Sequence, residues 1–151
     1  MNSFKEKVYQ ASIAQVKEKI KLLTEERKAI NEGILEDTKS SAGDKFETGR
    51  EMMSRDLMTI TTQIKQATAD LEELYRLQAV KNRTERVQEG SLVNLGDALY
   101  LISISFGALQ VGDKRLFLLS KNAPLGELLL GKKQNDQVEF RGKLFLVKEI
   151  A

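Results

Sequence analysis

Two stretches in the first half of the chain repeat apolar residues at alternating spacings of three and four, as a helical seam does. The first stretch comprises Tyr9, Ile13, Val16, Ile20, Leu23, Arg27, Ile30 and Ile34. The second comprises Met53, Leu57, Ile60, Ile64, Ala67, Leu71, Leu74 and Gln78. Paired in reverse order, from Ile34 with Met53 to Tyr9 with Gln78, the residue numbers of every pair sum to 87. Two seams with one reversal point predict an antiparallel coiled-coil hairpin over residues 1–82, turning at Gly43 and Asp44.

The segment around the reversal point, residues 36–51, is polar and carries more acidic than basic side chains. A charged run of this kind is usually a solvated loop. Asp44 and Glu47 also have the spacing of a capping box, with Asp44 as the N-cap of the second helix. The seam itself contains one charged side chain, Arg27, which either extends to solvent from the edge of the seam or sets its register.

After a polar linker at residues 83–89, the second half predicts a small β-rich domain over residues 90–151. Short β-rich runs occur at residues 91–95, 98–105, 115–120, 137–141 and 144–150. Gly96-Asp97, Gly112-Asp113 and Gly142-Lys143 supply turns between them. The second run alternates apolar residues on one face, which predicts a half-buried strand. Pro124 and Gly131 delimit one short helix, so an antiparallel sheet packed by that helix gives an α+β domain.

Several kinds of function are excluded by composition. The chain has no Cys and no His, so it has no disulfide, no Cys/His zinc site and no Ser-His-Asp or Cys-His mechanism. Its net charge is only +2, and both halves are nearly neutral, which argues against stable DNA binding. No apolar run approaches the ~18 residues that span a bilayer, and the first ten residues do not read as a secretory signal. A cytoplasmic location is therefore expected.

Two motifs resemble the Gre family of bacterial transcription elongation factors. At the reversal point, Gly43-Asp44-Lys45-Phe46-Glu47 is similar to that family's Gly-Asp-x-x-Glu. In the second half, the run from Leu119 to Lys132, LSKNAPLGELLLGK, resembles its C-terminal signature, in which an Ile-Ser pair leads into Ser-Pro-Leu and Leu-Leu-Gly-Lys. The family's Asp before the next strand corresponds to Asp136.

The resemblance implies an FKBP-like C-terminal domain that docks on bacterial RNA polymerase, with Ser120, Ala123, Pro124 and Leu125 at the contact. The hairpin would enter the secondary channel, where Asp44 and Glu47 help to hold a second Mg²⁺ while the polymerase cleaves backtracked RNA. The protein is then an accessory factor and not itself an enzyme. No cofactor is expected on the chain alone, and a monomer is expected because the coiled coil closes within one chain.

The chain departs from the family pattern at Thr48, Glu51 and Ala123, where the family has Asn, Tyr and Ser. A regulator that binds polymerase without stimulating cleavage therefore remains open. A prolyl isomerase or chaperone is another alternative, but an aromatic content of 6% argues against the aromatic-lined pocket of such a protein. A coiled-coil scaffold pairing between chains is the third.

Overall fold

The structure is a computed structural model that describes residues 2–39, 47–81 and 83–151, without the side chains of residues 37–39, 47 and 48. Its order of elements begins with the helices α1 (Asn2–Lys39) and α2 (Glu47–Ala79). The strands β1 (Leu92–Asn94), β2 (Leu99–Ile102), β3 (Gly107–Val111) and β4 (Lys114–Leu119) follow. The helix α3 (Pro124–Leu129) precedes β5 (Gln137–Phe140), β6 (Lys143–Leu146) and β7 (Glu149–Ile150). The chain forms two compact units, residues 14–71 and residues 1–13 with 72–151.

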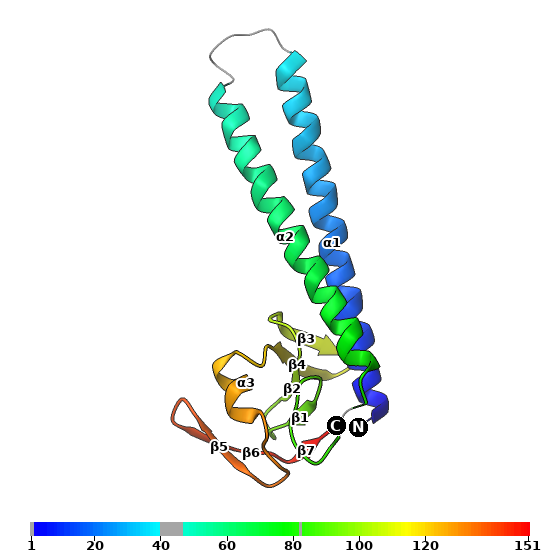
Figure 1. The fold of residues 1–151 in the computed structure, drawn as a ribbon, viewed down its shortest axis with the longest axis vertical. Coiled ribbons are helices and arrows are strands. Elements are labelled where there is room, and N and C mark those ends of the chain that lie inside the picture. The colour runs from blue at the N-terminus through cyan, green and yellow to red at the C-terminus, as the bar shows by residue number, and fades with distance from the viewer. Residues whose placement is uncertain (1, 40–46, 82) are drawn as a thin grey trace. The chain divides into compact units, whose positions relative to one another are not determined.

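The first unit is the shaft of an antiparallel helical hairpin, formed by α1 and α2 (Figure 1). Between residues 14 and 36, the only residues that are not exposed are those of the predicted seam and Gly33. Between residues 53 and 71, the only addition to the seam is Asp70. A Cβ atom on Gly33 would lie 3.5 Å from Cε of Met53, one residue from the predicted pairing of Ile34 with Met53. The hairpin is confirmed, and this contact lies within one residue of the predicted register; the turn predicted at Gly43 and Asp44 lies outside the described residues.

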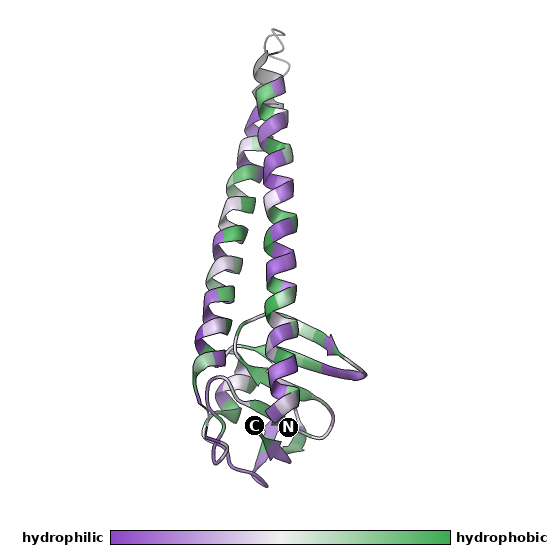
Figure 2. Cartoon of the chain, turned by 90° about the vertical axis from the view of Figure 1, so that its right-hand side faces the viewer, coloured by the Kyte–Doolittle hydropathy of each residue, from purple (hydrophilic) through white to green (hydrophobic). Residues whose placement is uncertain are grey.

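Hydropathy along the two helices follows this seam. Apolar and polar segments alternate along both α1 and α2 in Figure 2. Such alternation is what a helix needs to bury a stripe against one partner and leave the rest in water. The pattern that specifies the shaft therefore lies between residues that are close together in the sequence.

The second unit contains a five-stranded sheet in the order β3-β4-β2-β1-β7 and a separate hairpin of β5 with β6. The pairing of β2 with β4 is parallel, whereas the other pairs are antiparallel. The sheet is therefore mixed, where the sequence predicted an antiparallel one. A short chain can form a parallel pair only through a crossover, and here β3 provides part of that connection.

Three strand predictions need correction. The strand β3 was missed, because its only buried residue is Leu109 and it carries little apolar pattern. The predicted run 98–105 is a strand only as far as Ile102. The predicted run 144–150 is divided between β6 and β7, which belong to different sheets. The ends of these strands are set by pairing between segments that are distant in the sequence. Local β propensity does not report such pairing.

The sheet is buried on both of its faces. One face belongs to a core with α3 and the β5–β6 hairpin, formed by Val87, Val93, Leu95, Tyr100, Ile102, Leu125, Leu129, Val138, Val147 and Ile150. The other face carries the buried residues Leu92, Leu99, Leu101, Leu109, Leu116 and Leu118. All four side chains of β2 are buried, so the prediction of a half-buried strand there is wrong.

The base of the hairpin supplies further buried side chains of this unit. Val8, Ser12 and Leu77 are almost fully buried although none lies on the seam. Lys114, the first residue of β4, lies with Nζ 5.1 Å from the ring centroid of Phe4 in α1. The start of α1 and the end of α2 thus pack with the β-rich part of the chain.

Candidate functional site: the hairpin link and the loop before α3

The motif Gly43-Asp44-Lys45-Phe46-Glu47 falls at the link between the two long helices. The last residue of α1 is Lys39, and α2 begins at Glu47. Asp44 lies outside the described residues, and Glu47 is described only as the first residue of α2. The roles predicted for this pair, in capping and with metal, remain predictions. Within the described ranges, no group of three or more potential metal-ligating side chains occurs.

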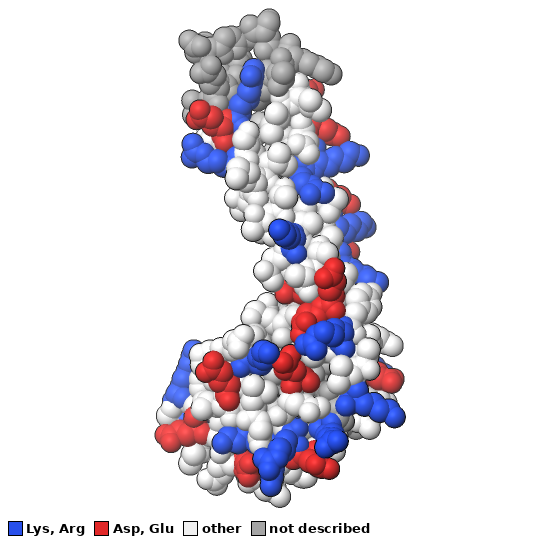
Figure 3. All heavy atoms as spheres, viewed as in Figure 1, with Lys and Arg blue, Asp and Glu red and all other residues white. Residues whose placement is uncertain are grey.

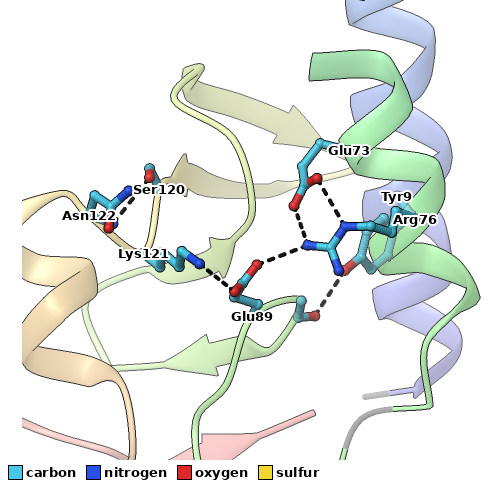
Figure 4. A network of polar contacts seen from close by, with 8 residues as sticks. Tyr9, Glu73, Arg76, Glu89, Ser120, Lys121 and Asn122 are labelled. Carbon is cyan, nitrogen blue, oxygen red and sulfur yellow. Dashed lines mark hydrogen bonds and ion pairs between the residues drawn. The ribbon is translucent and has the colours of Figure 1, made fainter. Parts of the chain in front are cut away.

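The second set of predicted site residues lies in residues 120–125, which we call the docking loop. It begins directly after β4 and turns the chain into α3. The amide of Ala123 donates to the carbonyl oxygen of Ser120 at 3.0 Å. The amide of Asn122 donates to Oγ of Ser120 at 3.1 Å (Figure 4). The side chain of Ser120 therefore stabilises the turn, as serine often does before a helix.

The docking loop runs into the first turn of α3, which begins at Pro124 as the sequence predicted. Ala123 occupies the N-cap in an extended conformation and has no side-chain cap, and Pro124 lies in the first turn. Proline suits this position because the amide it lacks has no partner within the helix. Glu127 adds a negative charge to the first turn, where the helix dipole favours it.

A close approach beside the loop requires glycine at position 126, a residue to which the sequence pattern assigned no role. A Cβ atom at Gly126 would lie 2.2 Å from the carbonyl oxygen of Ser120. A contact of that length is impossible for any residue with a side chain unless the backbone moves. The signal was present in the sequence as the glycine two residues after Pro124.

The structure brings the four predicted partner-binding residues together. Pro124 is exposed, and Ser120 and Ala123 are half-buried. Leu125 is instead 8% exposed and belongs to the hydrophobic core. The loop thus presents Pro124 to solvent on a support that Leu125 and Gly126 hold in place.

A network of charged side chains joins the docking loop to the base of α2. Nζ of Lys121 lies 2.8 Å from Oε1 of Glu89, and Arg76 lies 3.0 Å from Oε2 of the same carboxylate (Figure 4). Arg76 also binds Glu73 through two hydrogen bonds. The hydrogen bond from Lys121 lowers the pKa of Glu89, and that from Arg76 lowers the pKa of Glu73.

Next to this network, the phenol of Tyr9 in α1 donates to the carbonyl oxygen of Gly90 at 3.0 Å. Burial raises the pKa of Tyr9 to about 12, because the phenolate would lose its hydration. Sequence reasoning assigned Tyr9 only to the seam. Its partner lies 81 residues away along the chain, and no local pattern reports such a contact.

The second unit also contains a groove lined by aromatic rings, a feature that the aromatic content of the chain argued against. Of the three Tyr and six Phe in the chain, four line this groove: Tyr100, Phe117, Phe140 and Phe145. Leu125, Arg141 and Lys143 complete the lining of what we call the aromatic groove, whose volume is about 360 Å³. The inference that a low aromatic content argues against an aromatic-lined pocket is wrong, because the fold gathers these few rings in one place.

Comparison with known proteins gives two similar solved structures. No protein-family model matches the chain, and no curated protein sequence matches it. A structure of the transcription factor Gfh1 is 21% identical, with 93% of each chain covered and a TM-score of 0.36. A crystal structure of the GreA factor homolog 1 protein of Thermus thermophilus is 18% identical, with 93% of this chain and 95% of that chain covered and a TM-score of 0.34. Both are structures of a Gre-factor homologue.

Across residues 2–39, 47–81 and 83–151, no helix is both long and apolar enough to span a bilayer.

Proposed function

We propose that this chain is a transcription elongation factor that binds bacterial RNA polymerase and inserts its hairpin into the secondary channel. One observation carries the proposal: the Gly-Asp-x-x-Glu motif occupies the link between two long antiparallel helices, between Lys39 and the start of α2. The heptads and the motif were identified independently, and both locate the same point of the chain.

The shaft has the properties that such a role requires. The part of α1 that belongs to the shaft, residues 14–39, extends about 39 Å at ~1.5 Å per residue. The seam holds α1 against α2, and charged side chains of both signs lie along the exposed surface of the shaft (Figure 3). A self-supporting hairpin of that length is suited to carrying a charged link into a narrow channel.

The chemistry at the link depends on two carboxylates. Mg²⁺ in the polymerase active centre prefers carboxylate and water oxygens, and a second metal ion there stabilises the attacking and leaving oxygens of RNA hydrolysis. Asp44 and Glu47 would each contribute an oxygen ligand. The hairpin would carry them to the active centre, and the polymerase would supply the remaining ligands.

Docking is assigned to residues 120–125 on the basis of the C-terminal motif. The exposed ring of Pro124 and the turn held by Ser120 form a surface whose backbone is fixed by hydrogen bonds. A surface that is already ordered loses little conformational entropy on binding. The docking loop therefore anchors the factor while the hairpin extends into the enzyme.

RNA cleavage in stalled, backtracked elongation complexes tests the proposal. Addition of the protein should accelerate cleavage, and Asp44→Asn should remove most of that acceleration while polymerase binding persists. Asn caps a helix about as well as Asp but lacks the charge that Mg²⁺ favours, so this variant separates metal binding from capping. Glu47→Gln should behave in the same way. Asp56→Asn, which neutralises an exposed acid on the shaft, is the matched control and should leave cleavage unchanged.

The second candidate is a regulator that binds polymerase without stimulating cleavage, which the departures at Thr48 and Glu51 favour. Binding by the parent protein with no acceleration of cleavage would select this candidate. Restoring Asn at position 48 and Tyr at position 51 should then confer cleavage. Absence of any polymerase binding would reject both candidates.

A further inference from the structure

The aromatic groove is apolar inside and basic at its edge. Tyr100 and Phe117 come from the parallel pair β2–β4, where they lie opposite each other and stack with their ring centroids 5.6 Å apart. Phe140 and Phe145 come from the β5–β6 hairpin. Leu125 belongs to both this lining and the docking loop, so the groove and the loop are continuous.

Three cations lie over rings of the groove, and two of them, Arg141 and Lys143, belong to its lining. Arg141 lies 5.0 Å from the centroid of Phe140, and Lys143 lies 5.2 Å from that of Phe145. The guanidinium of Arg115 lies 5.4 Å from the centroid of Phe117. None of the three forms a salt bridge with an acidic side chain in the part of the chain that the structure describes.

We propose that the aromatic groove binds a short protein segment whose apolar side chains are flanked by acidic residues. The apolar residues would bury against the four rings and Leu125, and the carboxylates would pair with Arg141 and Lys143, the two cations of the lining. These two cations form no salt bridge within the described residues, so an acidic partner complements the site and a basic one is repelled. This inference rests on the proposed function in one respect: the polymerase surface that meets the docking loop is where such a segment would lie.

The same observations disfavour single-stranded nucleic acid as the occupant. Proteins of that class present open aromatic faces on which bases stack. Here a cation already covers one face of Phe117, Phe140 and Phe145, and Tyr100 stacks on Phe117. The free lining is therefore an apolar hollow that suits aliphatic side chains better than stacked bases.

Three synthetic peptides with the same Leu-Leu-Phe centre test the chemistry of the groove. One has glutamate flanks, one serine flanks and one lysine flanks, and binding is followed by amide chemical shifts of the full-length protein. The glutamate peptide should shift the signals of residues 140–145 and bind about tenfold more tightly than the serine peptide, with the difference shrinking as salt is added. Equal binding of all three peptides, no binding, or a preference for oligouridine over the glutamate peptide would each overturn the proposal.

Charge reversal makes the test sharper. The double variant Arg141→Glu/Lys143→Glu changes two exposed side chains and should reverse the preference, so that the lysine peptide binds more tightly than the glutamate peptide. Lys133→Glu, an exposed lysine outside the groove, is the matched control and should keep the original preference. Unchanged preference in the double variant, with the fold intact by circular dichroism, would contradict the assigned role of these cations.

Polymerase is tested separately, so that the two proposals fail independently. The glutamate peptide should compete with polymerase for the protein, and the double variant should weaken polymerase binding about tenfold relative to Lys133→Glu. Peptide binding without polymerase binding would reject the proposed function and keep the groove as a peptide site. Polymerase binding that neither the peptide nor the double variant affects would reject the link between the groove and polymerase.

Discussion

Gly126 shows how a single residue can decide the geometry of the docking loop. The carbonyl of Ser120 occupies the space where any other residue would have its Cβ atom. We predict that Gly126→Ala lowers the free energy of unfolding by about 1–3 kcal/mol, because the loop must move to relieve the overlap. Urea unfolding measures this. Gly49→Ala in α2 is the control: nothing lies within 4 Å of the position that its new methyl group would take, so helix propensity alone should raise stability, by up to about 1 kcal/mol.

Tyr9 gives a second prediction for a single side chain. Because the pKa of Tyr9 is raised to about 12 in the folded protein, its stabilising effect is complete below pH 10, the ordinary value. It is lost as the pH rises from 10 towards 12, at up to about 1.4 kcal/mol per pH unit. We expect Tyr9→Phe to be less stable than the parent by about 1 kcal/mol at neutral pH, since the carbonyl of Gly90 loses its donor.

Urea unfolding at pH 8 and pH 11 checks the pH dependence. Lysines titrate in the same range, so the quantity to compare is the difference between the parent and Tyr9→Phe. That difference should shrink or change sign at the higher pH. A constant difference would show that Tyr9 ionises equally easily in the folded and unfolded protein.

Among the elements, we expect one seam residue to lower the stability of the shaft. Arg27 is half-buried in a row of otherwise apolar side chains, and its predicted partner across the hairpin, Ile60, is buried. Arg27→Leu should raise the free energy of unfolding of the shaft by about 1 kcal/mol, because apolar area replaces a partly desolvated charge. Helical circular dichroism during thermal unfolding reports it. Lys28→Leu on the exposed face should give no such gain, and a loss in Arg27→Leu would reveal a structural partner for the guanidinium.

Across the molecule, Glu89 joins segments that are distant in sequence, α2 through Arg76 and the docking loop through Lys121. These side chains are partly exposed, so we expect Glu89→Gln to cost less than about 1 kcal/mol at neutral pH. The pKa of Glu89 is lowered in the folded protein, so its contribution is present above the ordinary value of 4.5 and is lost as the pH falls below it.

The stability of the parent and Glu89→Gln should therefore converge towards pH 3. Glu85→Gln, an exposed glutamate nearby in the chain, should match the parent throughout. A gap between the parent and Glu89→Gln that persists at low pH would mean that the carboxylate acts through its shape and not through its charge.

Features that depend on neighbours along the chain could be predicted without any knowledge of the fold. The two seams predicted the shaft because a helix places residues three and four apart on one face, whatever surrounds it. Pro124 predicted the start of α3 for the same reason, since its ring fixes the backbone locally. The position of the link motif could be predicted from the seams, because the chain must reverse direction between two antiparallel helices.

Features that depend on contacts between distant segments emerged only when the chain was folded. The exposed strand β3, the parallel pairing of β2 with β4 and the burial of both sheet faces arise from partners that local pattern does not specify. The same holds for the hydrogen bond from Tyr9 to Gly90 and for the gathering of four rings in the aromatic groove. Such contacts form because long-range packing lowers the free energy after local structure exists, and each joins residues whose separation in sequence carries no periodic signal.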